Sequence, residues 1–165
     1  LEAGVGTIRD KPELYPNYPN GQKHYGIDFP GSSASGAGTP IYATEDGIVD
    51  QVVIGHTMLT KDYDKGDGKS NMPFPYGNNI QIKGDDGIYT IYAHLTSVYV
   101  LKDESVVAGQ IIGTMGDTGN SYGAHLHYGK AKGNYDESHG FFSKELEENP
   151  WPYVDPHGKY TIKQG

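Results

Sequence analysis

Residues 78–95 have the sequence NNIQIKGDDGIYTIYAHL. Two runs in which apolar side chains recur, 78–83 and 87–95, flank the turn-forming triplet Asp85-Asp86-Gly87. An Asp-Gly pair between two such runs is typical of a β-hairpin. We therefore expect two neighbouring antiparallel strands in this segment.

The rest of the chain repeats the pattern of short apolar runs separated by glycines. These runs predict further strands at 24–29, 40–43, 47–54, 109–114 and 124–130. The 165 residues include 24 Gly and 10 Pro, and no long segment has the 3.6-residue repeat of an amphipathic helix. A helix is expected only at 143–148, where it would be short and acidic. The sequence therefore predicts a mostly antiparallel β protein, folded as a barrel or a sandwich.

A chain of 165 residues fits a single domain. Residues 1–23 contain three prolines and no periodicity, so we expect an irregular N-terminal segment followed by one domain over 24–165. Two polar excursions, 55–77 and 131–150, interrupt the strands. The chain opens without an initiator Met or a hydrophobic leader, which we interpret as the start of a mature or excised piece of a longer multidomain chain.

Composition excludes several classes of protein. The absence of Cys excludes disulfides, thiolate metal sites and Cys proteases. No apolar run approaches the roughly 20 residues of a membrane-spanning helix, so no membrane insertion is expected. The formal net charge is −8 and basic residues do not cluster, which disfavours nucleic acid as a partner.

The segment His125-Leu126-His127 contains the clearest candidate for chemistry. On a strand, side chains at positions i and i+2 project from the same face, so both imidazoles would enter one space while Leu126 turns toward the core. A pair of this kind is a common way to place metal ligands on a strand. By itself the pair is equally consistent with a purely structural role.

Two further segments add polar side chains in the same way. Read as strands, one places His24 and Asp28 on a shared face, and the other places His94 beside Thr90 and Tyr92. Each segment alone is explained by ordinary hydrogen bonds at a strand end. Together with the His-x-His pair they offer two His and one Asp for zinc, an open fourth position for water, and two remaining His for proton transfer. The residues alone leave open which His of the pair would take the metal, and no His-Glu-x-x-His motif is present.

The chain resembles the lysostaphin-type, or LytM-type, zinc endopeptidases that cut peptidoglycan peptides. The matching segments follow the family's order over roughly 24–153, and ordered agreement is more specific than any one motif. They are 24–29 (HYGIDF), 38–43 (GTPIYA), 46–49 (DGIV), 76–80 (YGNNI), 92–95 (YAHL), 108–113 (AGQIIG), 116–119 (GDTG), 123–128 (GAHLHY) and 149–153 (NPWPY).

The resemblance implies an antiparallel β fold with a groove, long loops and one zinc ion on the groove floor. By position, His24, Asp28 and His127 match the metal ligands, and His94 and His125 match catalytic His residues. The implied reaction is hydrolysis of a peptide bond in peptidoglycan stem peptides or cross-links. The expected place of action is extracellular, at the bacterial cell wall. A phage tail-associated protein, delivered by the virion or a targeting domain, is the favoured setting.

Three points stay open at this level. A catalytically inactive module of the same fold that binds cell-wall peptides is the main alternative, although all five family positions are present. A structural metal site is a third interpretation. The D-Ala–diaminopimelate cross-link is favoured over a glycine bridge as the scissile bond, and loop 55–77 is either a groove wall that selects substrate or a solvated surface loop.

Overall fold

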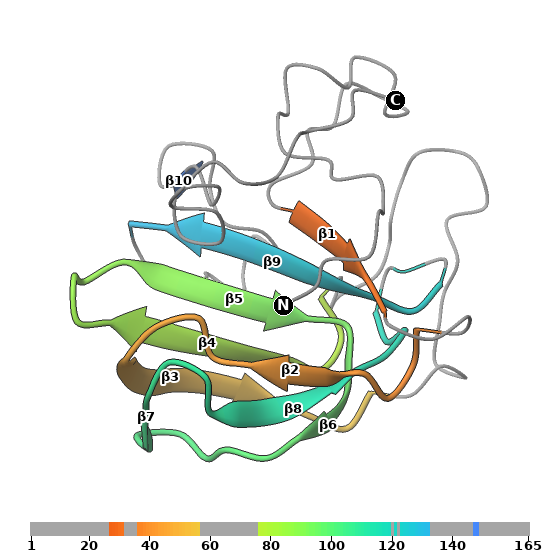
Figure 1. Cartoon of the computed structure of the whole chain (residues 1–165), viewed down its shortest axis with the longest axis horizontal. Coiled ribbons are helices and arrows are strands. Elements are labelled where there is room, and N and C mark those ends of the chain that lie inside the picture. Colours follow the sequence, from red (N-terminus) through yellow and green to blue (C-terminus); the bar gives the residue numbers. More distant parts are fainter. Residues whose placement is uncertain are drawn as a thin grey trace.

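The structure is a computed structural model that describes residues 27–31, 36–56, 76–119, 121, 123–132 and 147–148 (Figure 1). None of these residues lies in a helix, and hence none belongs to a helix that could cross a membrane. Every strand pairing among them is antiparallel, which confirms the predicted fold class. The strands are β1 (Ile27–Pro30), β2 (Pro40–Tyr42), β3 (Gly47–Val53), β4 (Asn79–Gly84), β5 (Tyr89–Ala93), β6 (Leu95–Val98), β7 (Ser105–Val106), β8 (Ile111–Met115), β9 (His125–Ala131) and β10 (Glu147–Glu148).

The predicted hairpin is present. Strands β4 and β5 pair with Ile80 opposite Tyr92 and Lys83 opposite Tyr89. Between them Gly87 has a φ of 80°, a left-handed conformation that a residue without Cβ adopts at little cost. Its N–H donates to the Gly84 carbonyl at 2.9 Å, which closes the turn.

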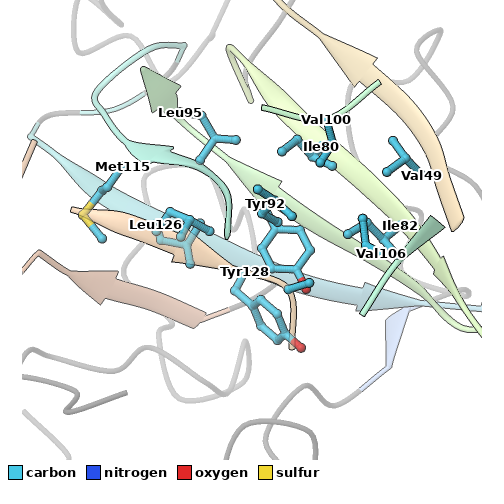
Figure 2. Packing of buried hydrophobic residues seen from close by; sticks show 13 residues of the cluster. Val49, Ile80, Ile82, Tyr92, Leu95, Val100, Val106, Met115, Leu126 and Tyr128 are labelled. Carbon is cyan, nitrogen blue, oxygen red and sulfur yellow. The ribbon is translucent and has the colours of Figure 1, made fainter. Parts of the chain in front are cut away.

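The strands of the described residues form two sheets. The larger has seven strands in the order β1-β9-β5-β4-β3-β7, with β10 also pairing with β9, and the smaller has the order β2-β8-β6. One buried hydrophobic cluster draws side chains from both sheets (Figure 2). Its members include Ile41, Val49, Ile80, Ile82, Tyr92, Leu95, Ile112, Met115, Leu126 and Tyr128.

Strand β9 is central to the site that follows. It lies between β5 on one side and β1 on the other, and β10 continues that second side beyond the end of β1. Its far end is anchored by Lys130, which is 1% exposed and forms an ion pair with Glu45. The Glu45 carboxylate also accepts a 2.7 Å hydrogen bond from Thr90 of β5. Burial lowers the pKa of Lys130, and the facing carboxylate opposes that shift.

Two local predictions are wrong. The helix expected at 143–148 is replaced at its end by β10, because Glu147 and Glu148 pair with the free edge of β9; residues 143–146 lie outside the described residues. Tertiary pairing has overridden local propensity there. The second error concerns the strand predicted over 87–95, which ends at Ala93 because His94 has a φ of 63°.

The faces of β5 also differ from the prediction. Tyr92 is fully buried in the main core rather than on a polar face. Ile91 and Ala93 pack on the other side of the sheet in a second, smaller cluster with Tyr76 and Ala131. Strand β5 is therefore covered on both faces, so its alternation cannot reveal which face bears the site.

Candidate active site

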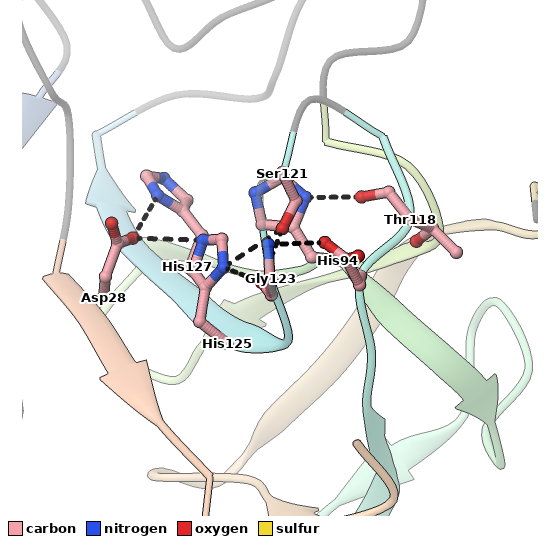
Figure 3. A network of polar contacts seen from close by, with 8 residues as sticks. Asp28, His94, Thr118, Ser121, Gly123, His125 and His127 are labelled. Carbon is pink, nitrogen blue, oxygen red and sulfur yellow. Dashed lines mark hydrogen bonds and ion pairs between the residues drawn. The ribbon is translucent and has the colours of Figure 1, made fainter. Parts of the chain in front are cut away.

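Strands β1 and β9 place three polar side chains beside one another. Asp28 of β1 lies directly opposite His127 of β9 in the antiparallel register, and Leu126 between the two His residues packs into the core. His127 Nδ1 lies 3.2 Å from Asp28 Oδ1, and His125 Nε2 lies 3.6 Å from the same oxygen. The predicted shared face of His125 and His127 is thus present (Figure 3).

His94 reaches the same place from the junction of β5 and β6. Its ring centroid lies 4.7 Å from that of His125 and 6.0 Å from that of His127. His94 and His127 are buried, at 4% and 5% exposure, whereas the His125 side chain is 22% exposed. The site therefore has a closed floor and one imidazole at the solvent side.

Backbone carbonyls determine the protonation of two of these rings. His94 Nδ1 lies 2.7 Å from the Thr118 carbonyl oxygen, and His125 Nδ1 lies 2.8 Å from that of Gly123. A carbonyl oxygen only accepts, so Nδ1 must carry the proton in both rings. In each neutral imidazole the lone pair is then on Nε2. Ser121 Oγ, 3.1 Å from His125 Nδ1, adds a second contact on the same side of that ring.

The electrostatics keep His94 neutral. Burial, followed by the nearby imidazoles of His125 and His127, lowers the pKa of His94 to about 3. The Thr118 carbonyl and the Asp28 carboxylate act in the opposite direction with smaller effect. At neutral pH this ring is therefore uncharged.

Tyr76 closes one side of the site. Its ring lies 5.3 Å from the His127 ring at an interplanar angle of 32°, and its carbonyl accepts the His94 N–H at 2.9 Å. Sequence reasoning assigned no role to Tyr76, Thr118, Ser121 or Gly123. Their one signal was membership of, or closeness to, the Gly-rich family segments.

Of the predicted metal ligands, the structure brings Asp28 and His127 together, and His24 lies outside the described residues. Among the residues that the structure describes, no group of three or more His, Cys, Asp or Glu side chains is arranged to hold a metal ion. In tetrahedral zinc sites, bonds of about 2.0–2.1 Å place neighbouring ligand atoms about 3.3 Å apart. The 3.2 Å between Asp28 Oδ1 and His127 Nδ1 is compatible with two ligands of one zinc ion.

The structure thus combines an antiparallel β fold with a cluster of three His side chains and one Asp side chain. The chain belongs to peptidase family M23, whose family model matches residues 22–137.

Individual relatives agree with this assignment. The chain is 34% identical over 115 residues to the DD-carboxypeptidase/endopeptidase Mpg of Neisseria meningitidis, covering 70% of this chain and 21% of Mpg. It is 31% identical over 145 residues to the glycyl-glycine endopeptidase ALE-1 of Staphylococcus capitis, covering 87% of this chain and 32% of ALE-1. The chain thus spans a third or less of the length of these relatives.

Solved structures show the same fold. The catalytic domain of lysostaphin from Staphylococcus simulans superimposes with a TM-score of 0.59 at 28% identity, covering 82% of each chain. The resemblance to lysostaphin-type endopeptidases inferred from sequence motifs is therefore confirmed.

Proposed function

We propose that this protein is a zinc-dependent endopeptidase that hydrolyses peptide bonds in bacterial peptidoglycan. The observation that carries the proposal is the convergence of Asp28, His94, His125 and His127 from three separate parts of the chain, with Nε2 lone pairs on His94 and His125. Family membership supports the reaction class. The names of relatives, which include DD-endopeptidases and a glycyl-glycine endopeptidase, support the wall as substrate.

In this proposal His24, Asp28 and His127 hold the zinc ion. When bound, zinc supplies a Lewis acid that polarises the scissile carbonyl and lowers the pKa of water. The pairing of β1 with β9 keeps the Asp28 carboxylate opposite His127, so these two donors need little rearrangement to bind an ion.

His94 and His125 handle the proton. The Nε2 lone pair of either ring can accept a proton from water as the water oxygen attacks the carbonyl carbon. The protonated ring then returns the proton to the amine nitrogen as the carbon–nitrogen bond breaks. His125 is the more exposed ring, so it is the better placed to exchange protons with solvent. His94 lines the buried side, and its lowered pKa makes it the weaker proton acceptor of the two.

The choice of scissile bond is a separate part of the proposal. Relatives that are about a third identical to this chain over the aligned residues are named for different bonds, since Mpg is a DD-carboxypeptidase/endopeptidase and ALE-1 a glycyl-glycine endopeptidase. We propose the D-Ala–diaminopimelate cross-link as the preferred bond, at the extracellular wall. Action from a phage tail stays a prediction.

Digestion of purified walls tests this function. Walls containing diaminopimelate cross-links and walls containing glycine bridges would be treated with the wild-type protein and with His127→Ala, and zinc would be quantified in both proteins. We expect about one zinc per wild-type chain and new peptide termini that the variant does not release. Zinc without cleavage of any wall would instead favour the inactive peptide-binding module.

A further inference from the structure

The backbone of His94 has an unusual conformation that its surroundings must hold. Its φ of 63° is in the left-handed region, which is uncommon for residues other than Gly. Such conformations persist where neighbouring groups over-determine them, and they gather at functional sites. Here the His94 N–H donates to the Tyr76 carbonyl, and the next N–H, of Leu95, donates to the Asn78 carbonyl, each at 2.9 Å.

Thr118 binds the ring of His94 and also the residue that follows His94. Its carbonyl accepts from the His94 ring at Nδ1, at 2.7 Å. Its hydroxyl donates to the carbonyl of Leu95, the residue that follows His94, at 2.9 Å. The same hydroxyl accepts the backbone N–H of Asn78 at 3.1 Å. Thr118 is 4% exposed, so these bonds form away from bulk water.

Asn78 completes the arrangement. Its side-chain Nδ2 donates to the Leu95 carbonyl at 3.0 Å, beside the bond from Thr118. The Leu95 carbonyl therefore receives two donors, and the hydroxyl of Thr118 both donates and accepts. These bonds fix the peptide group after Leu95, and the bond from the Leu95 N–H to the Asn78 carbonyl fixes the peptide group after His94.

We infer that Thr118 is a positioning residue for His94, with Asn78 as its support. The inference rests on the proposed function, in which the Nε2 atom of His94 takes part in proton transfer. The Thr118 carbonyl sets the tautomer of the imidazole, and the Thr118 hydroxyl holds the residue that follows His94. Loss of the hydroxyl would release the Leu95 carbonyl from one donor and leave the Asn78 N–H without its acceptor, so the backbone around His94 and the Thr118 carbonyl would shift relative to each other.

The test compares two substitutions of nearly equal size. Thr118→Val removes the hydroxyl and keeps the shape, whereas Thr118→Ser keeps the hydroxyl. Thr90→Val is the matched control, because Thr90 is also buried and hydrogen-bonded, but to Glu45 rather than to the site. The substrate is a soluble cross-linked muropeptide that the wild-type protein cleaves, and kcat and KM are measured separately.

We expect Thr118→Val to lower kcat on the order of ten- to a hundred-fold, because displacement of a catalytic group by about 1 Å has effects of that size. KM should change less than about twofold, Thr118→Ser should restore most of kcat, and Thr90→Val should lower the melting temperature with kcat unchanged. Equal kcat values for Thr118→Val and wild type would overturn the inference.

A spectroscopic measurement separates this inference from the proposed function. Long-range proton–nitrogen NMR of the imidazoles should show His94 as a single tautomer protonated at Nδ1 in the wild type, because its acceptor is a backbone carbonyl. In Thr118→Val we expect the His94 ring nitrogen shifts to move, because the bond from Nδ1 to that carbonyl changes in length when the hydroxyl bonds are lost. Ring nitrogen shifts identical to those of the wild type would contradict the inference even if the wild type cleaved no wall. If Thr118→Val does not fold, Asn78→Ala keeps the Thr118 hydroxyl and removes the supporting donor to Leu95, together with the side-chain bonds to His56. It should lower kcat several-fold, and full activity would count equally against the inference.

Discussion

At the scale of single residues, the site depends on which nitrogen of each imidazole carries a proton. The carbonyls of Thr118 and Gly123 hold the protons of His94 and His125 on Nδ1, which leaves the lone pair of each neutral ring on Nε2. The Nδ1 of His127 instead faces the Asp28 carboxylate. Two rings of the cluster are thus oriented by backbone carbonyls and the third by a carboxylate, which agrees with the separate role proposed for His127.

Substitution of the proton-transfer residues should separate metal binding from catalysis. We expect His94→Ala and His125→Ala to keep close to one zinc per chain and to lower kcat by roughly 10²–10⁴-fold, the usual contribution of general acid–base catalysis. Zinc content by elemental analysis and kcat on a soluble muropeptide check this.

His157→Ala is the control for these two variants, because His157 follows the last family segment in the sequence and no role is proposed for it. It should match the wild type in both measurements. Loss of zinc from His125→Ala would show that this residue, and not only His127, holds the metal.

At the scale of elements, the pairing of β1 with β9 builds the site. A slip of one residue in that register would turn His125 and His127 to the core face and Leu126 to the site, because side chains alternate along a strand. The ion pair of Lys130 with Glu45 and the pairing with β10 hold the other end of β9. The position of the His-x-His pair is therefore determined by contacts along the whole strand.

The turn before β4 should not accommodate even a methyl group at Gly77. Gly77 has a φ of 58°, and a Cβ there would lie 2.5 Å from both the carbonyl carbon and the hydroxyl of Thr118. We expect Gly77→Ala to lower the free energy of unfolding by about 1–3 kcal/mol, from backbone strain together with this clash. It should also lower kcat, because Thr118 contacts His94.

Gly87→Ala is the control that introduces backbone strain without a steric clash. Gly87 has a φ of 80°, but a Cβ there would meet nothing within 4 Å. Urea unfolding should show a smaller loss of stability than for Gly77→Ala, and kcat should be unchanged. Equal kcat values for the two variants would mean that the turn at Gly77 does not influence the site.

At the scale of the whole molecule, the segment between β3 and β4 begins and ends near the site. Val53 and Asn79 are paired neighbours, so the two ends of this segment lie side by side. Asn78 binds both backbone groups of His56 through its side chain, and the Tyr76 ring lies against His127. Both ends of the segment are thus tied to residues that contact the candidate active site.

Deletion of residues 57–74 tests whether this segment selects substrate. Because its ends are held at the site, we expect the shortened protein to keep its fold and to change its ratio of kcat/KM between diaminopimelate-type and glycine-bridged peptides by tenfold or more. That change corresponds to about 1.4 kcal/mol of differential binding in the transition state. An unchanged ratio, with an unchanged melting temperature, would identify the segment as a solvated surface loop.

Many features of the fold and of the site were predicted from the sequence alone. The Asp-Gly turn predicted the hairpin of β4 and β5, short apolar runs located β2, β3, β8 and β9, and the i, i+2 spacing put His125 and His127 on one face. These features depend on local alternation and turn chemistry, which a sequence displays directly. The order of the family segments was sufficient to identify the family.

Long-range contacts decided the rest. Strands β6, β7 and β10 are two to four residues long and carry no periodic signal, so only their partners define them. The left-handed backbone at His94 comes from hydrogen bonds to Tyr76, Asn78 and Thr118. The sequence shows residue types and their local spacing directly. Asp28 contacts His127, 99 residues later in the chain, and His94 contacts Thr118, 24 residues later, and both contacts form only when the strands have paired.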